Sequence, residues 1–198
     1  MNNSQILLDK QEFLQKMKLI APETYQGVAD RSLQISSFNG YGVKDITRGN
    51  HVRVFESGDI TAKGVRNINN GQTPADKHIY LTKIRVRTAK VKVEAGKTEE
   101  QIIGSINWDA NPILRTVANG EVTVSAAGST YIEKQSACIF DHANVTDVPS
   151  GEAVIPGKYL KPQSDINVEF DLVGEEELED NERLYIRVDF GGLMTTKA

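Results

Sequence analysis

Three histidines, His51, His78 and His142, are the side chains best suited to metal or proton-transfer chemistry in this chain of 198 residues. Zinc and non-haem iron sites need histidine, cysteine and carboxylate ligands that converge on one point. These histidines are widely separated and show no His-x-His or Glu-x-x-His spacing, so we predict His51 and His78 at the starts of strands and His142 in a loop. Asp141 and His142 are adjacent, and adjacent side chains of a strand point to opposite faces, which argues against a catalytic pair.

The single cysteine, Cys138, lies in the apolar fragment Ser-Ala-Cys-Ile-Phe. A free cysteine without an activating base or cation behaves as a small buried hydrophobe, so we predict Cys138 in the core. One cysteine also excludes an internal disulfide framework. The sequence has no Gly-x-Ser-x-Gly motif, no phosphate-binding loop and no dinucleotide fingerprint. We therefore predict a protein that is not an enzyme, and assign no catalytic, cofactor-binding or metal-binding residues.

Residues 174–182 are mostly acidic and join two strand-like segments. Clustered carboxylates can collect Ca²⁺, because this hard cation takes six or more oxygen ligands. The spacing differs from that of an EF-hand loop, so we interpret the segment as a solvated connection that keeps this end of the sheet soluble. Binding of Ca²⁺ and a salt-sensitive contact with a basic neighbour stay open as alternatives.

A basic stripe is formed by Lys83, Arg85, Arg87, Lys90 and Lys92. The first three share one face of a predicted strand whose other face carries Ile84 and Val86. Such a stripe could meet nucleic acid or an acidic partner, although basic side chains commonly cover a wet sheet face. The net charge of −4 and the isoelectric point near 5.5 give no case for nucleic acid as the main partner. Acidic and basic segments on one chain also suit head-to-tail contact between copies.

The composition is that of a soluble globular protein with one substantial core. Hydrophobic residues make up 39% of the chain and charged residues 25%. Residues 1–8 lack the basic region of a signal peptide, and no apolar run approaches the roughly 20 residues that cross a bilayer. We therefore expect no membrane-spanning segment, and synthesis and assembly in a cytoplasm.

Alternating apolar residues predict antiparallel β-sheet with one buried face. The pattern is clearest over residues 166–172 and 184–190, where every second residue is apolar. Strands are predicted over residues 33–38, 51–56, 78–88, 90–95, 113–118, 121–126, 130–135, 137–140, 164–173 and 183–190. The pair Asn119-Gly120 predicts a hairpin, and a change of apolar phase near Ala89 predicts a bulge or corner. Residues 67–74 and 147–157 are predicted loops.

A helix is predicted near the N-terminus. Asp9 and Glu12 have the spacing of a capping box, Leu8 and Phe13 fit a hydrophobic staple, and Pro22 ends the helix near residue 21. Its apolar face is formed by Phe13, Leu14, Met17 and Ile20. A short amphipathic helix is not stable alone, so we expect it to dock on its own domain or, as the second alternative, on a neighbouring subunit.

These patterns predict an all-β fold, an antiparallel β-sandwich with one N-terminal amphipathic helix. A single jelly roll is the leading topology. An immunoglobulin-like sandwich is the main rival, although the chain lacks its Cys–Trp–Cys core. The predicted domains are an N-terminal helical arm over residues 1–30 and a β-sandwich (jelly-roll) domain over residues 31–198.

Three features resemble the small jelly-roll structural proteins of icosahedral viruses and bacteriophages. The first is the amphipathic N-terminal arm. The second is Gly-Val-Arg-Asn-Ile at residues 64–68 and Gln-Thr-Pro-Ala-Asp at residues 72–76, which lead into the strand of residues 79–87. The third is Ile-Pro-Gly-Lys-Tyr-Leu-Lys-Pro at residues 155–162, followed by the strand of residues 166–172 and a closing strand that ends in Phe190-Gly191-Gly192. The chain departs from many capsid proteins in lacking a strongly basic N-terminal tail.

The resemblance implies a non-enzymatic structural protein of a bacteriophage or virus particle: a subunit of the capsid shell, a vertex or a decoration. It implies a location in the virion after assembly in the host cytoplasm. The implied partners are copies of the chain itself and other virion proteins, with no cofactor and no small-molecule ligand. The N-terminal helix would then bridge to a neighbouring subunit.

Two other functions stay open. The first is a β-sandwich module that binds carbohydrate or protein. Trp108, the single tryptophan, could supply the aromatic platform of a sugar site or could fill the core. The second is an enzyme on a β scaffold, against which the scattered histidines argue, because acid–base and metal chemistry need positioned partners.

Overall fold

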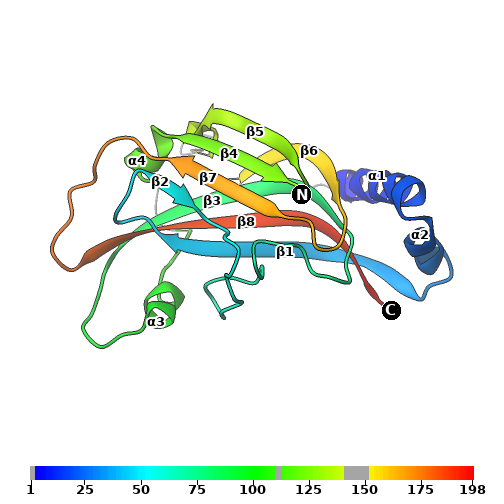
Figure 1. Ribbon diagram of the computed structural model, residues 1–198, viewed down its shortest axis with the longest axis horizontal. Coiled ribbons are helices and arrows are strands. Elements are labelled where there is room, and N and C mark those ends of the chain that lie inside the picture. The colour runs from blue at the N-terminus through cyan, green and yellow to red at the C-terminus, as the bar shows by residue number, and fades with distance from the viewer. Residues whose placement is uncertain (1–2, 110–112, 141–151) are drawn as a thin grey trace.

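The computed structural model describes residues 3–109, 113–140 and 152–198. In these residues, eight strands form two four-stranded antiparallel sheets that face each other as a sandwich (Figure 1). The first sheet has the order β1-β8-β3-β6, from β1 (Leu33–Asp45), β8 (Glu182–Lys197), β3 (Ile79–Lys92) and β6 (Glu152–Leu160). The second has the order β2-β7-β4-β5, from β2 (His51–Arg53), β7 (Ile166–Asp171), β4 (Glu121–Ala126) and β5 (Ser129–Ser136).

The strand pairs are nested along the chain. β1 pairs with β8, β2 with β7, β3 with β6 and β4 with β5, all antiparallel. Eight strands paired in this way and rolled into two sheets form a jelly roll. The predicted fold class is confirmed, and the rival immunoglobulin-like order is not the one observed.

The core lies between the inner faces of the two sheets. Every second residue of β4, β7 and β8 points into it, as the alternating pattern predicted. The most completely buried of these side chains are Val122, Val124, Val168, Phe170, Ile186, Val188 and Phe190. Burial of each valine, isoleucine or phenylalanine contributes about 1.5–3 kcal/mol to stability, so the sandwich core holds the fold together.

β1 is longer than predicted, because it continues through two glycines to Asp45. The ring of Phe55 occupies the space beside Gly42, where a Cβ atom would lie 2.5 Å from Cε1 of Phe55. Gly40 makes the same kind of room for Phe38 and Ile68. Glycine is a poor strand former, but here bulky neighbours supply the hydrophobic contact that these two positions lack.

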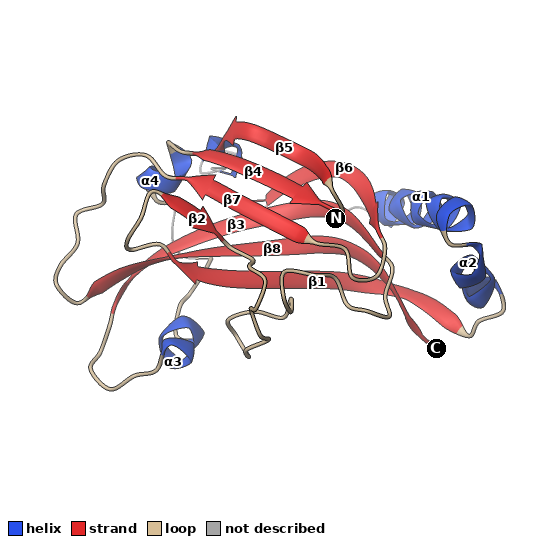
Figure 2. Ribbon diagram, in the orientation of Figure 1, coloured by secondary structure: helices blue, strands red, loops and turns tan. Residues whose placement is uncertain are grey.

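Two helices, α1 (Asn3–Ile20) and α2 (Pro22–Ala29), lie at one end of the first sheet (Figure 2). The predicted capping box and hydrophobic staple are wrong, and Ile20, which was predicted on the apolar face, is exposed. Asp9 lies inside α1, where it is buried and accepts a hydrogen bond from Nε2 of Gln5 at 2.8 Å. Pro22 ends α1 as predicted, but it also begins α2, because its fixed φ suits the first turn of a helix.

Four other local predictions are wrong. Residues 113–118 contain a short helix, α4 (Arg115–Ala118), so Asn119-Gly120 follows a helix and closes no hairpin. Residues 137–140 form a 3-10 helix, η1 (Ala137–Phe140), in place of a strand. β6 runs through most of the predicted loop of residues 147–157, of which 147–151 lie outside the described residues. α3 (Glu99–Gly104) was not predicted, although Thr98 and Gln101 form its capping box.

The predicted bulge or corner near Ala89 is wrong, and the change of apolar phase there has another cause. β3 is continuous past Ala89, and its irregularity lies between Leu81 and Lys83. Ala89 is buried on the outer face because Trp108 and α3 cover that face, and Val91 packs against the same cluster. The pattern therefore changes because the buried face of the strand changes along its length.

Candidate functional site

Both ends of the outer face of the first sheet are covered. At one end, Phe13 and Met17 of α1 are fully buried against Tyr80 of β3. The rings of Phe13 and Tyr80 stack with their centroids 5.6 Å apart. Burial and a hydrogen bond donated by the Tyr80 hydroxyl to Glu12 raise the pKa of Tyr80. α1 thus docks on its own domain, the first of the two alternatives.

At the other end of this face, Trp108 is buried with Ile102 and Ile103 of α3. These side chains cover Val43 of β1 and Tyr185 of β8. Trp108 therefore fills a core, and the interpretation of Trp108 as an exposed platform for a sugar is wrong.

A charged network lies between the two covers, on β3 and β8. Asp189 accepts hydrogen bonds from Arg87 at 2.6 Å and from Arg187 at 2.8 Å. Asp109, from the segment after α3, is bonded through one oxygen to Arg85 at 2.8 Å and Arg87 at 3.0 Å. Burial raises the pKa of Asp109, but the two guanidinium groups outweigh burial, so its pKa lies below the usual range.

Arg187 is held by stacking as well as by charge. Its guanidinium lies 4.6 Å from the centroid of the Tyr41 ring and 5.8 Å from that of Trp108. Such cation–π contacts contribute about 0.5–2 kcal/mol, depending on how much water they exclude. The network therefore has a fixed geometry, in contrast to a row of mobile surface charges.

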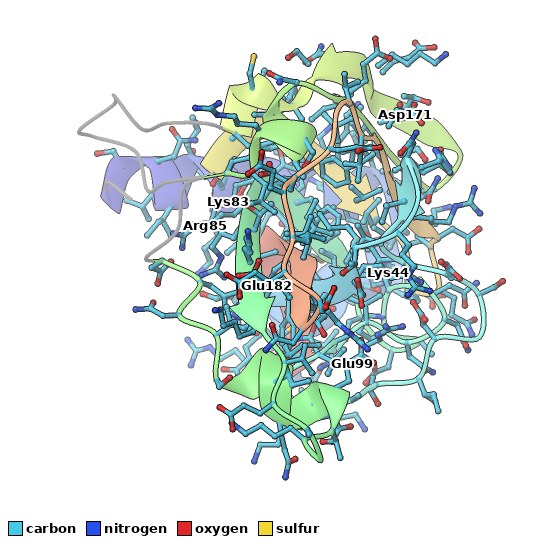
Figure 3. The ribbon with its side chains drawn as sticks, turned by 90° about the vertical axis from the view of Figure 1, so that its left-hand side faces the viewer. Lys44, Lys83, Arg85, Glu99, Asp171 and Glu182 are labelled. Carbon is cyan, nitrogen blue, oxygen red and sulfur yellow. The ribbon has the colours of Figure 1, made fainter. Side chains whose placement is uncertain are left out.

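Two adjoining cavities lie on this face, of about 160 and 330 Å³. They share Asn39, Lys83 and Gly191, so together they form one groove across β1, β8 and β3. Gly191 lies in its floor against the stem of Lys83, since a Cβ atom there would lie 2.4 Å from Cε of Lys83 and would displace that side chain. The lysine stem lies across the glycine between the two halves of the groove, near Arg85 on the same flank (Figure 3).

The acidic segment and the end of the basic stripe meet within the chain. Lys90 pairs with Glu182 at 2.8 Å, and Lys92 pairs with Glu179 at 2.7 Å. Glu182 begins β8, but Lys90 also donates to the backbone oxygen of Glu177, so Lys90 and Lys92 attach the β7–β8 loop, residues 172–181, to the end of β3. Two acidic and two basic residues that could have served a neighbour therefore have partners in their own chain. In the described residues, no group of three or more His, Cys, Asp or Glu side chains could hold a metal ion.

The structure does not bring His51 and His78 together. His51 begins β2 of the second sheet, as predicted, with Nδ1 2.7 Å from Oδ1 of Asp171. His78 precedes β3 of the first sheet, where its Nε2 lies 3.1 Å from the Thr24 hydroxyl and its Nδ1 2.6 Å from the Tyr159 hydroxyl. Asp141 and His142 lie outside the described residues.

His78 joins α2 to the sandwich and is expected to make stability depend on pH. Burial, and secondly the charge of Lys161, lower the pKa of His78 below its usual 6.5. Because the folded state favours the neutral ring, this contribution is complete above pH 6.5 and is lost as the pH falls through the folded pKa. We expect the free energy of unfolding of the wild type to decrease between pH 7 and pH 5 more than that of His78→Gln. Urea titrations across this range measure the difference, and parallel profiles would contradict it.

Cys138 is exposed on η1, so the prediction that it belongs to the core is wrong. The neighbouring Ala137 and Phe140 are fully buried and carry the apolar contact of this fragment. The 3-10 turn directs Cys138 outward. The prediction had assumed a strand here, on the evidence of the apolar run alone.

Over the part of the chain that the structure describes, the fold is an eight-stranded jelly roll with a charged groove on the outer face of its first sheet. No protein-family model and no curated protein sequence matches it. Among solved structures, it is similar to a chain of the acid-stable capsid of Helicobacter pylori bacteriophage KHP30, at 12% identity and a TM-score of 0.32. The match covers 84% of this chain and 99% of that one. At this level, the capsid chain defines neither the fold nor the function of this one. None of the described helices is long and apolar enough to cross a membrane.

Proposed function

We propose that this chain is a non-enzymatic structural subunit of a bacteriophage or virus particle, in its shell, at a vertex or as a decoration. It acts through contacts with copies of itself and with other virion proteins, and resides in the virion. The jelly roll is a fold of viral capsid domains, but also of lectins and cupins, so the fold alone does not decide between these classes.

The observation that carries the proposal is the apolar outer side of α1. Phe13 and Met17 fix the helix to the sheet, and yet Leu7, Leu8 and Leu19 are 62%, 49% and 83% exposed. Leu8 and Leu19 are separated by about three helical turns, so they lie on the same side. Large apolar side chains held outward on an anchored helix are typical of an interaction surface. The helical arm over residues 1–30 would then be the part that contacts the neighbouring subunit, and residues 31–198 the body.

The mass of the purified chain in solution tests this proposal. We expect light scattering to give rings, particles or other oligomers, and negative-stain images of the same peak to show their shape. The double variant Leu8→Glu/Leu19→Glu is expected to shift the material toward the 21.9 kDa monomer. Both positions are exposed, so the variant leaves the docked side of α1 intact.

The matched control is Gln11→Glu/Gln15→Glu, which adds the same charge at exposed positions of the same helix. This control is expected to assemble as the wild type does. A wild type that stays monomeric at every concentration, with or without other virion proteins, would refute the proposed function. Equal loss of assembly in both double variants would assign the effect to charge and remove the exposed leucines as its basis.

A further inference from the structure

We infer that the start of β1, residues 33–37, pairs edge to edge with the same segment of a second copy of this chain. β1 forms one margin of the first sheet (Figure 1), so this contact would join the first sheets of two copies across a two-fold axis. The inference rests on the proposed function, because it names a contact through which the subunits would join.

The backbone of β1 alternates between β8 and the outer margin of the sheet. On the side away from β8, Val43 donates its N–H to the carbonyl of Val65 at 2.9 Å. On the same side, Tyr41 donates its N–H to Oδ1 of Asn67 at 2.6 Å. The odd-numbered residues of β1 therefore point their N–H and C=O groups away from β8, and the segment around Val65 and Asn67 covers the middle of this edge.

The start of β1 lies beyond this cover. Thr195, which faces Ile35, donates its N–H to His78 on the other side of β8, so Ile35 also points its polar groups outward. Within the part of the chain that the structure describes, the outward N–H and C=O groups of Leu33, Ile35 and Ser37 make no hydrogen bond. Three consecutive outward positions are thus available to another strand.

This segment lacks the features that protect the other sheet edges. Natural edge strands are protected by charged side chains, proline, bulges or short length. β6 carries Pro156 and Lys158. β5 carries Glu133 and Lys134 and has an irregular register, and β2 is three residues long. Residues 33–43 of β1, by contrast, contain no charged residue and no proline, so this is the edge best suited to strand addition.

A two-fold axis beside Ile35 gives each outward group a partner. Ile35 then faces Ile35 of the second copy, and Leu33 faces Ser37 of the second copy. Residues that face each other in this way exchange two backbone hydrogen bonds per pair. Any other antiparallel register leaves Leu33 or Ser37 without its partner in the segment.

The side chains of the segment also suit contact with a second copy. The segment carries no charge, so no like charges meet across the axis. Ile35 packs against the cluster of Phe13, Met17 and Tyr80, and the axis would bring two such clusters together. This self-complementarity in backbone and side chains favours a second copy over a foreign peptide as the occupant.

A mixture of two cysteine variants tests the register. All variants carry Cys138→Ser, because Cys138 is exposed and would form other links. In the proposed register, the Cα atoms of residue 33 in one copy and residue 37 in the other lie about 5.5 Å apart, which suits a disulfide. An oxidised mixture of Leu33→Cys and Ser37→Cys is expected to give a linked dimer of twice the 21.9 kDa chain mass. Each variant alone is expected to stay unlinked, because its two cysteines would be four residues apart along the paired strands.

A proline at Ser37 tests the hydrogen bonds. Ser37 is exposed and its N–H points away from β8, so Ser37→Pro removes an outward donor and keeps the pairing of β1 with β8. Each pair of copies loses two hydrogen bonds, so half-assembly is expected to need a roughly tenfold higher concentration, measured by light scattering. The matched control is Ser37→Thr, which keeps the N–H and is expected to assemble as the wild type does. Thermal unfolding checks that both variants are folded.

The outcomes separate this inference from the proposed function. Linkage in the mixture and in neither single variant supports the inference. A mixture that stays unlinked while the wild type assembles overturns it and leaves the proposed function standing. Equal assembly of folded Ser37→Pro and Ser37→Thr also overturns it, and if Ser37→Pro does not fold, the cysteine mixture decides. A wild type that stays monomeric at every concentration removes the proposed function and this inference together.

Discussion

Replacing Phe13 with alanine is expected to lower the free energy of unfolding by about 3–5 kcal/mol. Phe13 is fully buried, stacks on Tyr80 and lies 5.8 Å from the ring of Tyr159, so its removal leaves a cavity between α1 and the sheet. For a chain of this length, the midpoint of thermal unfolding is expected to fall by roughly 10 °C. Thermal and urea unfolding followed by circular dichroism measure both quantities.

The control for this prediction is Leu19→Ala on the same helix. Leu19 is 83% exposed, so its truncation is expected to change stability by less than about 0.5 kcal/mol. If Phe13→Ala were as mild as Leu19→Ala, α1 would not be fixed to the sandwich in solution. Limited proteolysis of residues 3–29 distinguishes a detached helix from one that remains docked.

The second large effect is expected for Gly192→Ala, at about 3 kcal/mol of lost stability. A Cβ atom at Gly192 would lie 2.0 Å from the backbone oxygen of Tyr80, on the neighbouring strand. The clash is with backbone, which no change of side-chain rotamer can relieve. It also falls beside the irregularity between Leu81 and Lys83, where β3 and β8 change register.

Gly104→Ala provides the matched glycine control, since a Cβ atom there would meet nothing within 4 Å. Gly104 ends α3, so alanine is expected to be neutral or to stabilise by up to about 1 kcal/mol. Equal unfolding midpoints for the two alanine variants would mean that the strands at Gly192 separate easily. In that case the register of β3 and β8 would not depend on this glycine.

The strands that were predicted correctly from the sequence are those with one solvent-exposed face and one apolar face. In β7, Ile166, Val168 and Phe170 face the core while Asn167 and Glu169 lie on the other face. Regular alternation of this kind has no simple explanation other than a strand with one buried face. The order of the strands within the two sheets is that of the predicted jelly roll. Helix α1 was found for the same reason, because Phe13 and Met17 recur at helical spacing and are buried.

The strand that was missed, β6, depends on contacts with residues that are distant in the sequence. β6 contains Pro156 and Gly157, which are typical of turns, but Gly157 is needed beside Tyr80, where a Cβ atom would lie 2.0 Å from the hydroxyl. Composition alone therefore predicted a loop. β6 can nevertheless contain a proline, because it is an edge strand of its sheet. α3 could have been found from Thr98 and Gln101, whose capping box is a local signal.

The groove could not have been predicted from the sequence. Lys83 and Gly191 face each other only because β3 and β8 pair in this register. The predicted basic stripe was real, but its residues differ in role: Arg85 and Arg87 bind Asp109, whereas Lys90 and Lys92 hold the β7–β8 loop. Sequence spacing places side chains on a face and does not say which partners that face will meet.

The exposed position of Cys138 makes the chain convenient for imaging, because it contains one cysteine and that thiol can be reached without unfolding. A maleimide-linked gold cluster would mark every subunit once, at the same point of η1. In electron micrographs of an assembled particle, the pattern of gold would repeat with the rotational symmetry of the ring or shell. The order of that symmetry, five, six or otherwise, would follow from counting labels, without an atomic reconstruction.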